Sequence, residues 1–133
     1  MARPLRVLVV DDTPDIVSTM MELLRLEGHE VDSCDNGTDV LRCVRKFDPD
    51  IVLLDIELPG LSGWEVARRI RQHATKGKRP VLIAITGEYT KAVDQILGEI
   101  TGFNYYLVKP ADPKVLMTLL AKVKAELTHT DSS

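Results

Sequence analysis

The chain has 133 residues and a formal net charge of −3, and hydrophobic residues make up 44% of it. This length fits one globular domain, which we expect at residues 5–127, followed by a polar tail at 128–133. The acidic balance argues against a nucleic-acid or anionic-membrane surface, because basic residues supply the affinity for both. No apolar run approaches the ~20 residues that a membrane helix needs. The N-terminus carries no signal-peptide pattern, so we expect a cytoplasmic protein.

Two cysteines, Cys34 and Cys43, are too few for a disulfide scaffold, and they lack a C-x-x-C spacing. Thiols with this spacing in a cytoplasmic protein normally stay reduced. We therefore expect both to be reduced and partly buried.

Short β-branched runs alternate along the chain with segments of helical period. Thr13 and Pro14 offer a capping hydroxyl and a proline for the start of the first helix, and Gly28 stands where that helix should end. Asn36 and Asp112 are expected to begin two later helices. Strands are predicted at Leu5–Val10, Glu30–Ser33, Ile51–Leu54, Val81–Ile85 and Tyr105–Val108. Helical stripes are predicted at Ile16–Leu24, Val40–Val44, Val66–Ile70, Val93–Ile100 and Leu116–Leu127.

Five successive β-α units predict a parallel sheet with helices on both faces. The first, third and fourth strands are almost continuously apolar, as strands buried on both faces should be, whereas the second is more polar and suits an edge. With right-handed crossovers, we predict an α/β fold: a doubly wound, flavodoxin-like five-stranded parallel sheet of order 2-1-3-4-5. Ligands of such sheets bind beyond the carboxyl ends of the strands.

Acidic side chains follow two of these strand ends: Asp11 and Asp12 follow the first strand, and Asp55 follows the third. Three carboxylates in one place repel each other unless a cation joins them. Mg²⁺ prefers oxygen ligands of this kind, and Mn²⁺ is the alternative. We expect Asp12 and Asp55 as direct ligands, Asp11 directly or through water, and the backbone carbonyl of Glu57 as a further ligand.

Asp55 is also the best candidate for a nucleophile, because an aspartate carboxylate can attack phosphorus and form an acyl phosphate. The incoming phosphoryl oxygens need positive charge and hydrogen-bond donors. Lys109, after the fifth strand, supplies an ammonium group, and Thr86, at the end of the fourth, supplies a hydroxyl.

The sequence resembles the receiver domain of two-component response regulators over residues 5–127. Its stretch at 102–112 resembles receivers fused to hybrid histidine kinases more than it resembles those of chemotaxis. Each matching motif alone is a weak signal, but their order and their places at strand ends make a strong one. The matches are Val9-Val10-Asp11-Asp12, Asp55, Leu58-Pro59-Gly60-Leu61-Ser62-Gly63, Thr86 and Tyr106-Leu107-Val108-Lys109-Pro110.

This resemblance implies that Asp55 receives a phosphoryl group from a phosphohistidine of a histidine kinase or phosphotransfer protein. Thr86 and Lys109 bind the phosphoryl oxygens, and the Lys109-Pro110 peptide is cis. Thr86 and Tyr106 move as a switch that repacks the face of the fourth helix, fifth strand and fifth helix. That face acts on an output protein or a fused domain. The chain modifies itself and turns over no separate metabolite.

Three other functions are alternatives for a chain of this architecture. A flavodoxin needs a glycine- and hydroxyl-rich phosphate loop, whereas the loop after the first strand carries Asp11 and Asp12. A haloacid-dehalogenase-type phosphatase needs D-x-D-x-T, which neither acidic stretch matches. A docking module that works without phosphorylation is the remaining alternative. It usually lacks one of the site residues, whereas Asp11, Asp12, Asp55, Thr86 and Lys109 are all present.

Overall fold

The computed structural model describes residues 4–58, 61–73, 80–87 and 102–131. Its sheet has five parallel strands in the order β2-β1-β3-β4-β5, which confirms the predicted fold. The helix expected at Val93–Ile100 lies outside the described residues. The strands are β1 (Arg6–Val10), β2 (Glu30–Cys34), β3 (Ile51–Asp55), β4 (Val81–Thr86) and β5 (Tyr105–Val108). The helices are α1 (Pro14–Leu26), α2 (Val40–Phe47), α3 (Gly63–Gln72) and α5 (Pro113–Asp131), and a 3-10 turn at Gly37–Asp39 precedes α2.

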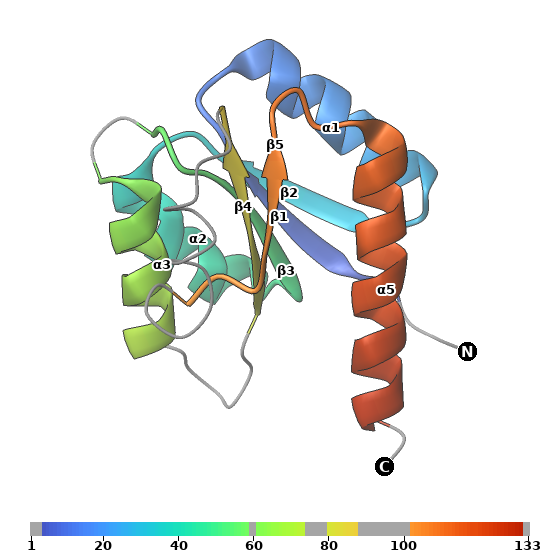
Figure 1. Cartoon of the computed structure of the whole chain (residues 1–133). Helices are drawn as coiled ribbons and strands as arrows, with labels where there is room; N and C mark the ends of the chain where they lie inside the picture. The colour runs from blue at the N-terminus through green and yellow to red at the C-terminus, as the bar shows by residue number, and fades with distance from the viewer. Residues whose placement is uncertain (1–3, 59–60, 74–79, 88–101, 132–133) are drawn as a thin grey trace.

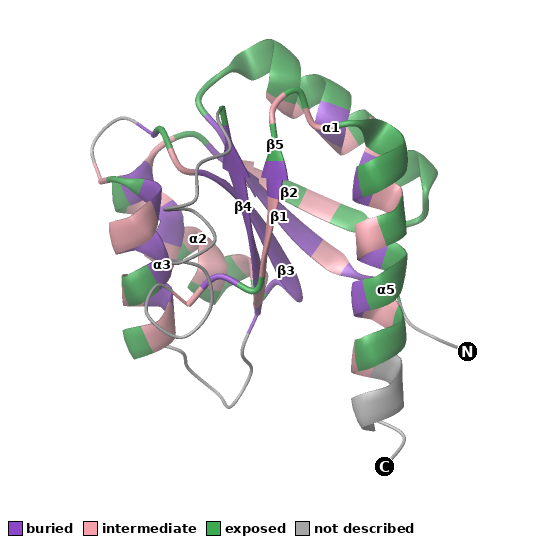
Figure 2. Ribbon diagram, viewed as in Figure 1, coloured by how far each residue is buried: buried purple, intermediate pink, exposed green. Residues whose placement is uncertain are grey.

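Helices cover both faces of the sheet: α1 and α5 lie on one face, and α2 and α3 on the other (Figure 1). Successive residues of a strand point to opposite faces, so each strand contributes to two apolar clusters. In β1, Val7 and Val9 pack on the α1/α5 side, and Leu8 and Val10 on the α2/α3 side. All residues of β3 are buried, which explains its continuous apolar run (Figure 2). The edge strand β2 is half open, as its more polar sequence predicted.

Helix boundaries follow the local signals in most places. Gly28 ends α1 with a φ of 90°, a left-handed conformation that glycine adopts without strain. Asp112 accepts a hydrogen bond from the backbone N–H of Lys114 at 2.8 Å and so begins α5. Thr13 precedes α1, but its hydroxyl makes no capping hydrogen bond, contrary to our prediction. Its backbone N–H instead donates to Asp11 Oδ1, which ties this loop to the strand end.

The last helix, α5, continues to Asp131 and therefore includes most of the segment expected as a polar tail. Its early turns are held to the core by Leu116, Leu120 and Val123, which are all buried. An established helix adds each further residue at little cost, so polar residues can extend it. None of the helices in the described part of the chain combines the length and apolar character that crossing a membrane requires.

Candidate functional site

The predicted site residues gather at one edge of the sheet, where the parallel strands end. Asp11 follows β1, Asp55 is the last residue of β3, and Thr86 is the last residue of β4. Lys109 follows β5, and its backbone N–H donates to the carbonyl of Thr86 at 2.7 Å. Residues from four strands, nearly a hundred positions apart in the chain, therefore meet because all strands point the same way (Figure 1).

Three carboxylates form an acidic cluster of Asp11, Asp12 and Asp55, in which each residue offers an oxygen within 4.8 Å of the others. Asp11 and Asp55 are 3% and 2% exposed, whereas Asp12 is open to solvent. Burying two carboxylates so close together is unfavourable unless a cation compensates for their charge. An all-oxygen set with one side open to water fits Mg²⁺, which binds through a few carboxylates and keeps water ligands.

Backbone hydrogen bonds hold the buried carboxylates of this cluster in place. Asp11 Oδ1 accepts from the N–H of Thr13 at 2.9 Å, and Asp55 Oδ1 accepts from the N–H of Glu57 at 2.9 Å. The N–H of Asp11 itself donates to the carbonyl of Cys34 at the end of β2, at 3.1 Å. These bonds do not use up the carboxylates, since each carboxylate has about four lone-pair sites and can accept several partners.

Lys109 supplies positive charge beside the acidic cluster, because its Nζ lies 2.9 Å from Asp55 Oδ2. The Lys109-Pro110 peptide is cis, as the resemblance implied. Partial burial lowers the pKa of Lys109, but the hydrogen bond and charge of Asp55, with the charges of Asp11 and Glu57, raise it above its usual value. The ammonium group is thus held charged and next to the buried carboxylate.

Two further site residues, Thr86 and Glu57, lie beside the acidic cluster. Thr86 is 7% exposed, and Gly87 follows it at the end of β4. A Cβ placed on Gly87 would lie 3.7 Å from a carboxylate oxygen of Glu57, so the exposed Glu57 side chain reaches the β4 end of the site. Glu57 does not join the acidic cluster through its side chain. Its expected contribution to a metal is through the backbone carbonyl, and that remains a prediction.

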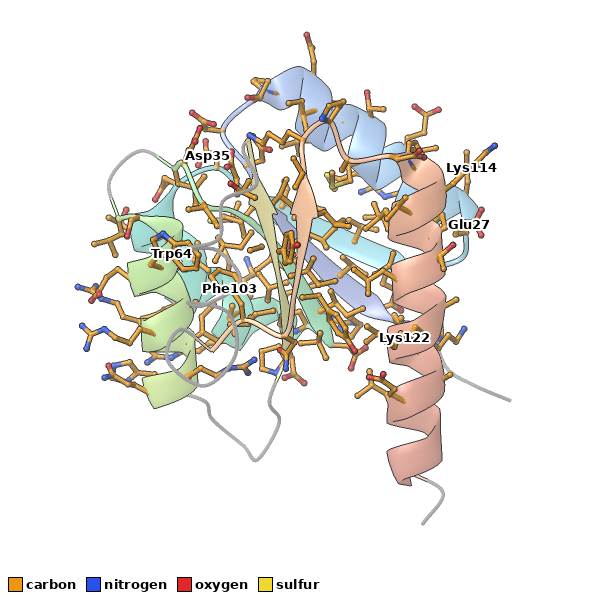
Figure 3. The ribbon with its side chains drawn as sticks, viewed as in Figure 1. Glu27, Asp35, Trp64, Phe103, Lys114 and Lys122 are labelled. Carbon is orange, nitrogen blue, oxygen red and sulfur yellow. The ribbon has the colours of Figure 1, made fainter. Side chains whose placement is uncertain are left out.

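Tyr106 lies on β5 and packs, half-buried, against the α2/α3 cluster. It also lines a surface groove of about 580 Å³ between β5 and α5. Lys114 and Lys122, on α5, border this groove (Figure 3). Figure 3 also labels Trp64 and Phe103, whose rings meet edge to face with centroids 5.4 Å apart, so Trp64 is partly packed.

Sequence reasoning missed a second groove, which begins at the acidic cluster and runs between α1 and the loop after β5. It has a volume of about 540 Å³. Asp11 and Lys109 lie at its polar end, and Ile16, at 38% exposed, lines it. A signal was present in the sequence, because Ile16 belongs to the apolar stripe of α1. The remaining lining residues include Asp15, Met20, Pro110, Ala111 and Leu116.

Known proteins resemble the chain over nearly its whole length. Residues 7–121 match the family described as response regulator receiver domain. Protein PilH of Pseudomonas aeruginosa is 34% identical over 120 residues, which cover 90% of this chain and 98% of PilH. The DNA-binding response regulator MtrA of Mycobacterium tuberculosis is 39% identical over 126 residues, which cover 95% of this chain and 52% of MtrA. The chain thus spans about half the length of that relative.

A solved receiver-domain structure that contains a metal ion is also similar to the chain. The receiver domain of sensor histidine kinase PA1611 from Pseudomonas aeruginosa, solved with a magnesium ion coordinated in its active-site cleft, has a TM-score of 0.79. It is 27% identical to this chain, and the match covers 92% of this chain and 98% of that one. Receiver domains act as phosphoacceptors in signalling and typically bind Mg²⁺ in an acidic pocket. The chain belongs to the receiver-domain family of two-component response regulators.

Proposed function

We propose that the chain is a signalling switch in which Asp55 accepts a phosphoryl group from a phosphohistidine, with Mg²⁺ bound at the acidic cluster. The observation that carries this proposal is the environment of Asp55. Its carboxylate is buried, lies within 4.8 Å of two other carboxylates, and is 2.9 Å from the ammonium group of Lys109. Such an arrangement suits a nucleophile that must receive a highly charged group.

Asp11, Asp12 and Asp55 would hold the cation through their carboxylates, and Glu57 through its backbone carbonyl, with Mn²⁺ as an alternative ion. When bound, the ion would offset the charge of the acidic cluster and of the phosphoryl oxygens. The N–H groups of Thr13 and Glu57 orient the carboxylates of Asp11 and Asp55, whose oxygens lie within 4.8 Å of one another and of Asp12.

Asp55 supplies the attacking oxygen. A bond forms between that oxygen and phosphorus while the bond from phosphorus to the imidazole nitrogen breaks, and the imidazole keeps the electron pair and takes up a proton from solvent. Lys109 is already next to Asp55 Oδ2, and it can shift to a phosphoryl oxygen as the carboxylate loses its charge. Thr86 provides a hydroxyl donor from the neighbouring strand. The chain thereby modifies itself and turns over no separate metabolite.

The groove between α1 and the loop after β5 supports docking of the phosphohistidine donor there. It joins the site directly, since Asp11 and Lys109 lie at one end. Its walls are mostly apolar, with Ile16 partly exposed, so a helix of a histidine kinase or phosphotransfer protein could bury its own apolar side chains against them. Docking in this groove brings the histidine within reach of Asp55.

Output is proposed to pass through Thr86 and Tyr106 to the surface of β5 and α5. A phosphoryl group adds negative charge and acceptor oxygens, which favour the arrangement in which Thr86 and Lys109 point toward it. Lys109 and Thr86 are joined by a backbone hydrogen bond, and Tyr106 lies on the strand that leads to Lys109. The groove lined by Tyr106 is therefore the proposed surface for an output protein or fused domain.

Incubation of the protein with acetyl phosphate and Mg²⁺, followed by intact mass measurement, tests the chemistry. The wild type should gain the mass of one phosphoryl group, and the gain should disappear with EDTA and in Asp55→Asn. Asp48→Asn is the matched control, because Asp48 is exposed, precedes β3 at the opposite sheet edge, and has a φ of 54° that asparagine also adopts. Unchanged phosphorylation in Asp55→Asn would refute the assignment of Asp55, whereas a wild type that gains no mass would favour the docking module that works without phosphorylation.

A further inference from the structure

One side chain of α3 joins the starts of two strands at the amino end of the sheet. Arg71 lies in the last turn of α3, and its Nε and Nη2 both donate to the backbone carbonyl of Gly102, at 2.9 and 2.7 Å. Its Nη1 donates to the carbonyl of Pro80, directly before β4, at 2.8 Å. Its Nη2 also donates to Oδ1 of Asn104, directly before β5, at 2.7 Å. A planar guanidinium holds several acceptors in one fixed arrangement, which the ammonium point charge of a lysine does not.

The backbone at Gly102 leaves room for the Arg71 side chain. Gly102 has a φ of 86°, a left-handed conformation that glycine adopts without strain. A Cβ at this position would lie 2.6 Å from Cγ of Arg71, so a larger residue would push the arginine away. The stem of Arg71 therefore packs on the bare backbone of Gly102, while its guanidinium binds the carbonyl of the same residue.

The two residues after Gly102 carry this attachment into the sheet. Phe103 is 1% exposed, and its ring meets that of Trp64, which is also on α3. Asn104 Oδ1 accepts a second hydrogen bond, from the N–H of Leu82 at 2.9 Å, and the N–H of Asn104 donates to the carbonyl of Leu82 at 2.8 Å. The chain is thus fixed to both α3 and β4 directly before β5 begins.

The strand β5 depends on such attachments more than the central strands do. It has four residues, stands at the edge of the sheet and pairs with β4 among the described strands. Its carboxyl end is held by the bond from the N–H of Lys109 to the carbonyl of Thr86, and by the ion pair of Lys109 with Asp55. Its amino end is held by Arg71.

We propose that Arg71 is a positioning residue for Lys109: by fixing the start of β5 to α3, it sets where the strand ends and so keeps the Lys109 ammonium group beside Asp55. The two residues lie at opposite ends of β5, whose four residues span about 13 Å. Substitutions that far apart normally act independently, so a coupling between them has to pass along the strand. The consequence for phosphorylation rests on the proposed function, whereas the coupling itself does not.

A double-mutant cycle of Arg71→Met and Lys109→Met tests this in two ways. In urea unfolding without Mg²⁺, the double variant should lose less stability than the two single variants together, because Lys109 contributes less once Arg71 is gone. In phosphorylation by acetyl phosphate at saturating Mg²⁺, Arg71→Met should be about tenfold slower than the wild type, below the roughly hundredfold that a misplacement of ~1 Å can cost. The same change in a Lys109→Met background should not slow the reaction further, because Arg71 acts through Lys109.

Arg45→Met is the matched control, because Arg45 is an exposed arginine on α2, and it should change neither measurement. Arg71→Lys keeps the charge but not the guanidinium fork, so it should also slow phosphorylation, and it replaces Arg71→Met in the cycle if that variant unfolds. Far-ultraviolet circular dichroism checks that each variant is folded.

Additive losses of stability would overturn the proposal, as would a wild-type rate of phosphorylation in the folded Arg71 variant. A wild type that gains no phosphoryl mass would refute the proposed function instead. In that case the unfolding cycle still decides the role of Arg71, because it needs no phosphoryl donor.

Discussion

Lys109 Nζ lies 2.9 Å from Asp55 Oδ2, although the two residues are 54 positions apart in the chain. The carboxylate is 2% exposed and the lysine side chain 29% exposed, so the pair sits at the boundary between core and solvent. At that boundary the lysine can balance the charge of Asp55 and still move to a new partner. The pair is the best starting point for mutations, because both the stability of the fold and the proposed phosphoryl transfer should depend on it.

Lys109→Met should destabilise the protein and slow its phosphorylation. The change leaves Asp55 buried near two like charges, and since the lysine is partly exposed we expect a loss of about 1–2 kcal/mol, below the range for fully buried pairs. Phosphorylation by acetyl phosphate should slow by about a hundredfold, as for the loss of one charge-stabilising group. Urea unfolding and intact mass measure the two effects. Lys114→Met removes an exposed lysine and should change neither; equal effects of the two variants would contradict the role of Lys109.

Mg²⁺ should stabilise the wild type, because we expect the ion to bind the folded acidic cluster and not the dispersed carboxylates of the unfolded chain. At a hundred times its Kd, the ion should add about 2.7 kcal/mol to the free energy of unfolding. Asp12→Asn should behave differently. Because it relieves repulsion between the carboxylates, its free energy of unfolding in EDTA should rise by up to about 1 kcal/mol, but Mg²⁺ should stabilise it less than the wild type. Thermal melts of both proteins, with Asp48→Asn as the control, measure this. Equal Mg²⁺ responses in wild type and Asp12→Asn would exclude Asp12 as a ligand.

Glu57→Ala should lengthen the lifetime of the phosphorylated form. The Glu57 side chain reaches Gly87 at the rim of the site, where its carboxylate can accept a proton from the water that hydrolyses the acyl phosphate. Because Glu57 is exposed and loosely held, the change should be roughly tenfold or less. Loss of the phosphoryl mass over time measures the rate of hydrolysis. Glu57→Gln removes the charge of the side chain but keeps its size, so it shows which of the two matters. Identical decay in Glu57→Ala and wild type would eliminate this role.

His29 should make stability depend on pH below about 6.5, its usual pKa in an unfolded chain. Burial, with the nearby charge of Lys124, lowers the pKa of His29 in the fold, although Glu27 opposes this. Its Nδ1 is buried and has no hydrogen-bond partner within the described part of the chain. As the pH falls, the unfolded chain takes up a proton before the folded one does, so stability declines until the folded pKa is passed.

His29→Gln should therefore lose less stability than the wild type between pH 7 and pH 5, as measured by urea unfolding at each pH. His73→Gln, at an exposed position, is the matched control and should follow the wild type. The same decline in wild type and His29→Gln would show that other groups cause it.

The sequence by itself determined the fold and the location of the site. The alternation of strand and helix periods in the hydrophobic pattern identified all five strands. The strand β5 has the predicted bounds Tyr105–Val108, and each of the other strands differs from its prediction by one residue at one end. Polar residues directly after apolar strands could be assigned to one edge, because parallel strands end together. The places of Asp11, Asp55 and Lys109 followed from that rule alone.

The tertiary structure decided which atoms meet. Sequence periodicity describes neighbours along one element, whereas contacts between elements depend on how their side chains pack across the sheet. The pairing of Lys109 with Asp55 and the groove beside Ile16 are of this second kind. Sequence patterns also missed a contact at short range. The backbone N–H of Thr13 donates to the carboxylate of Asp11, and the Thr13 hydroxyl does not make the expected capping hydrogen bond.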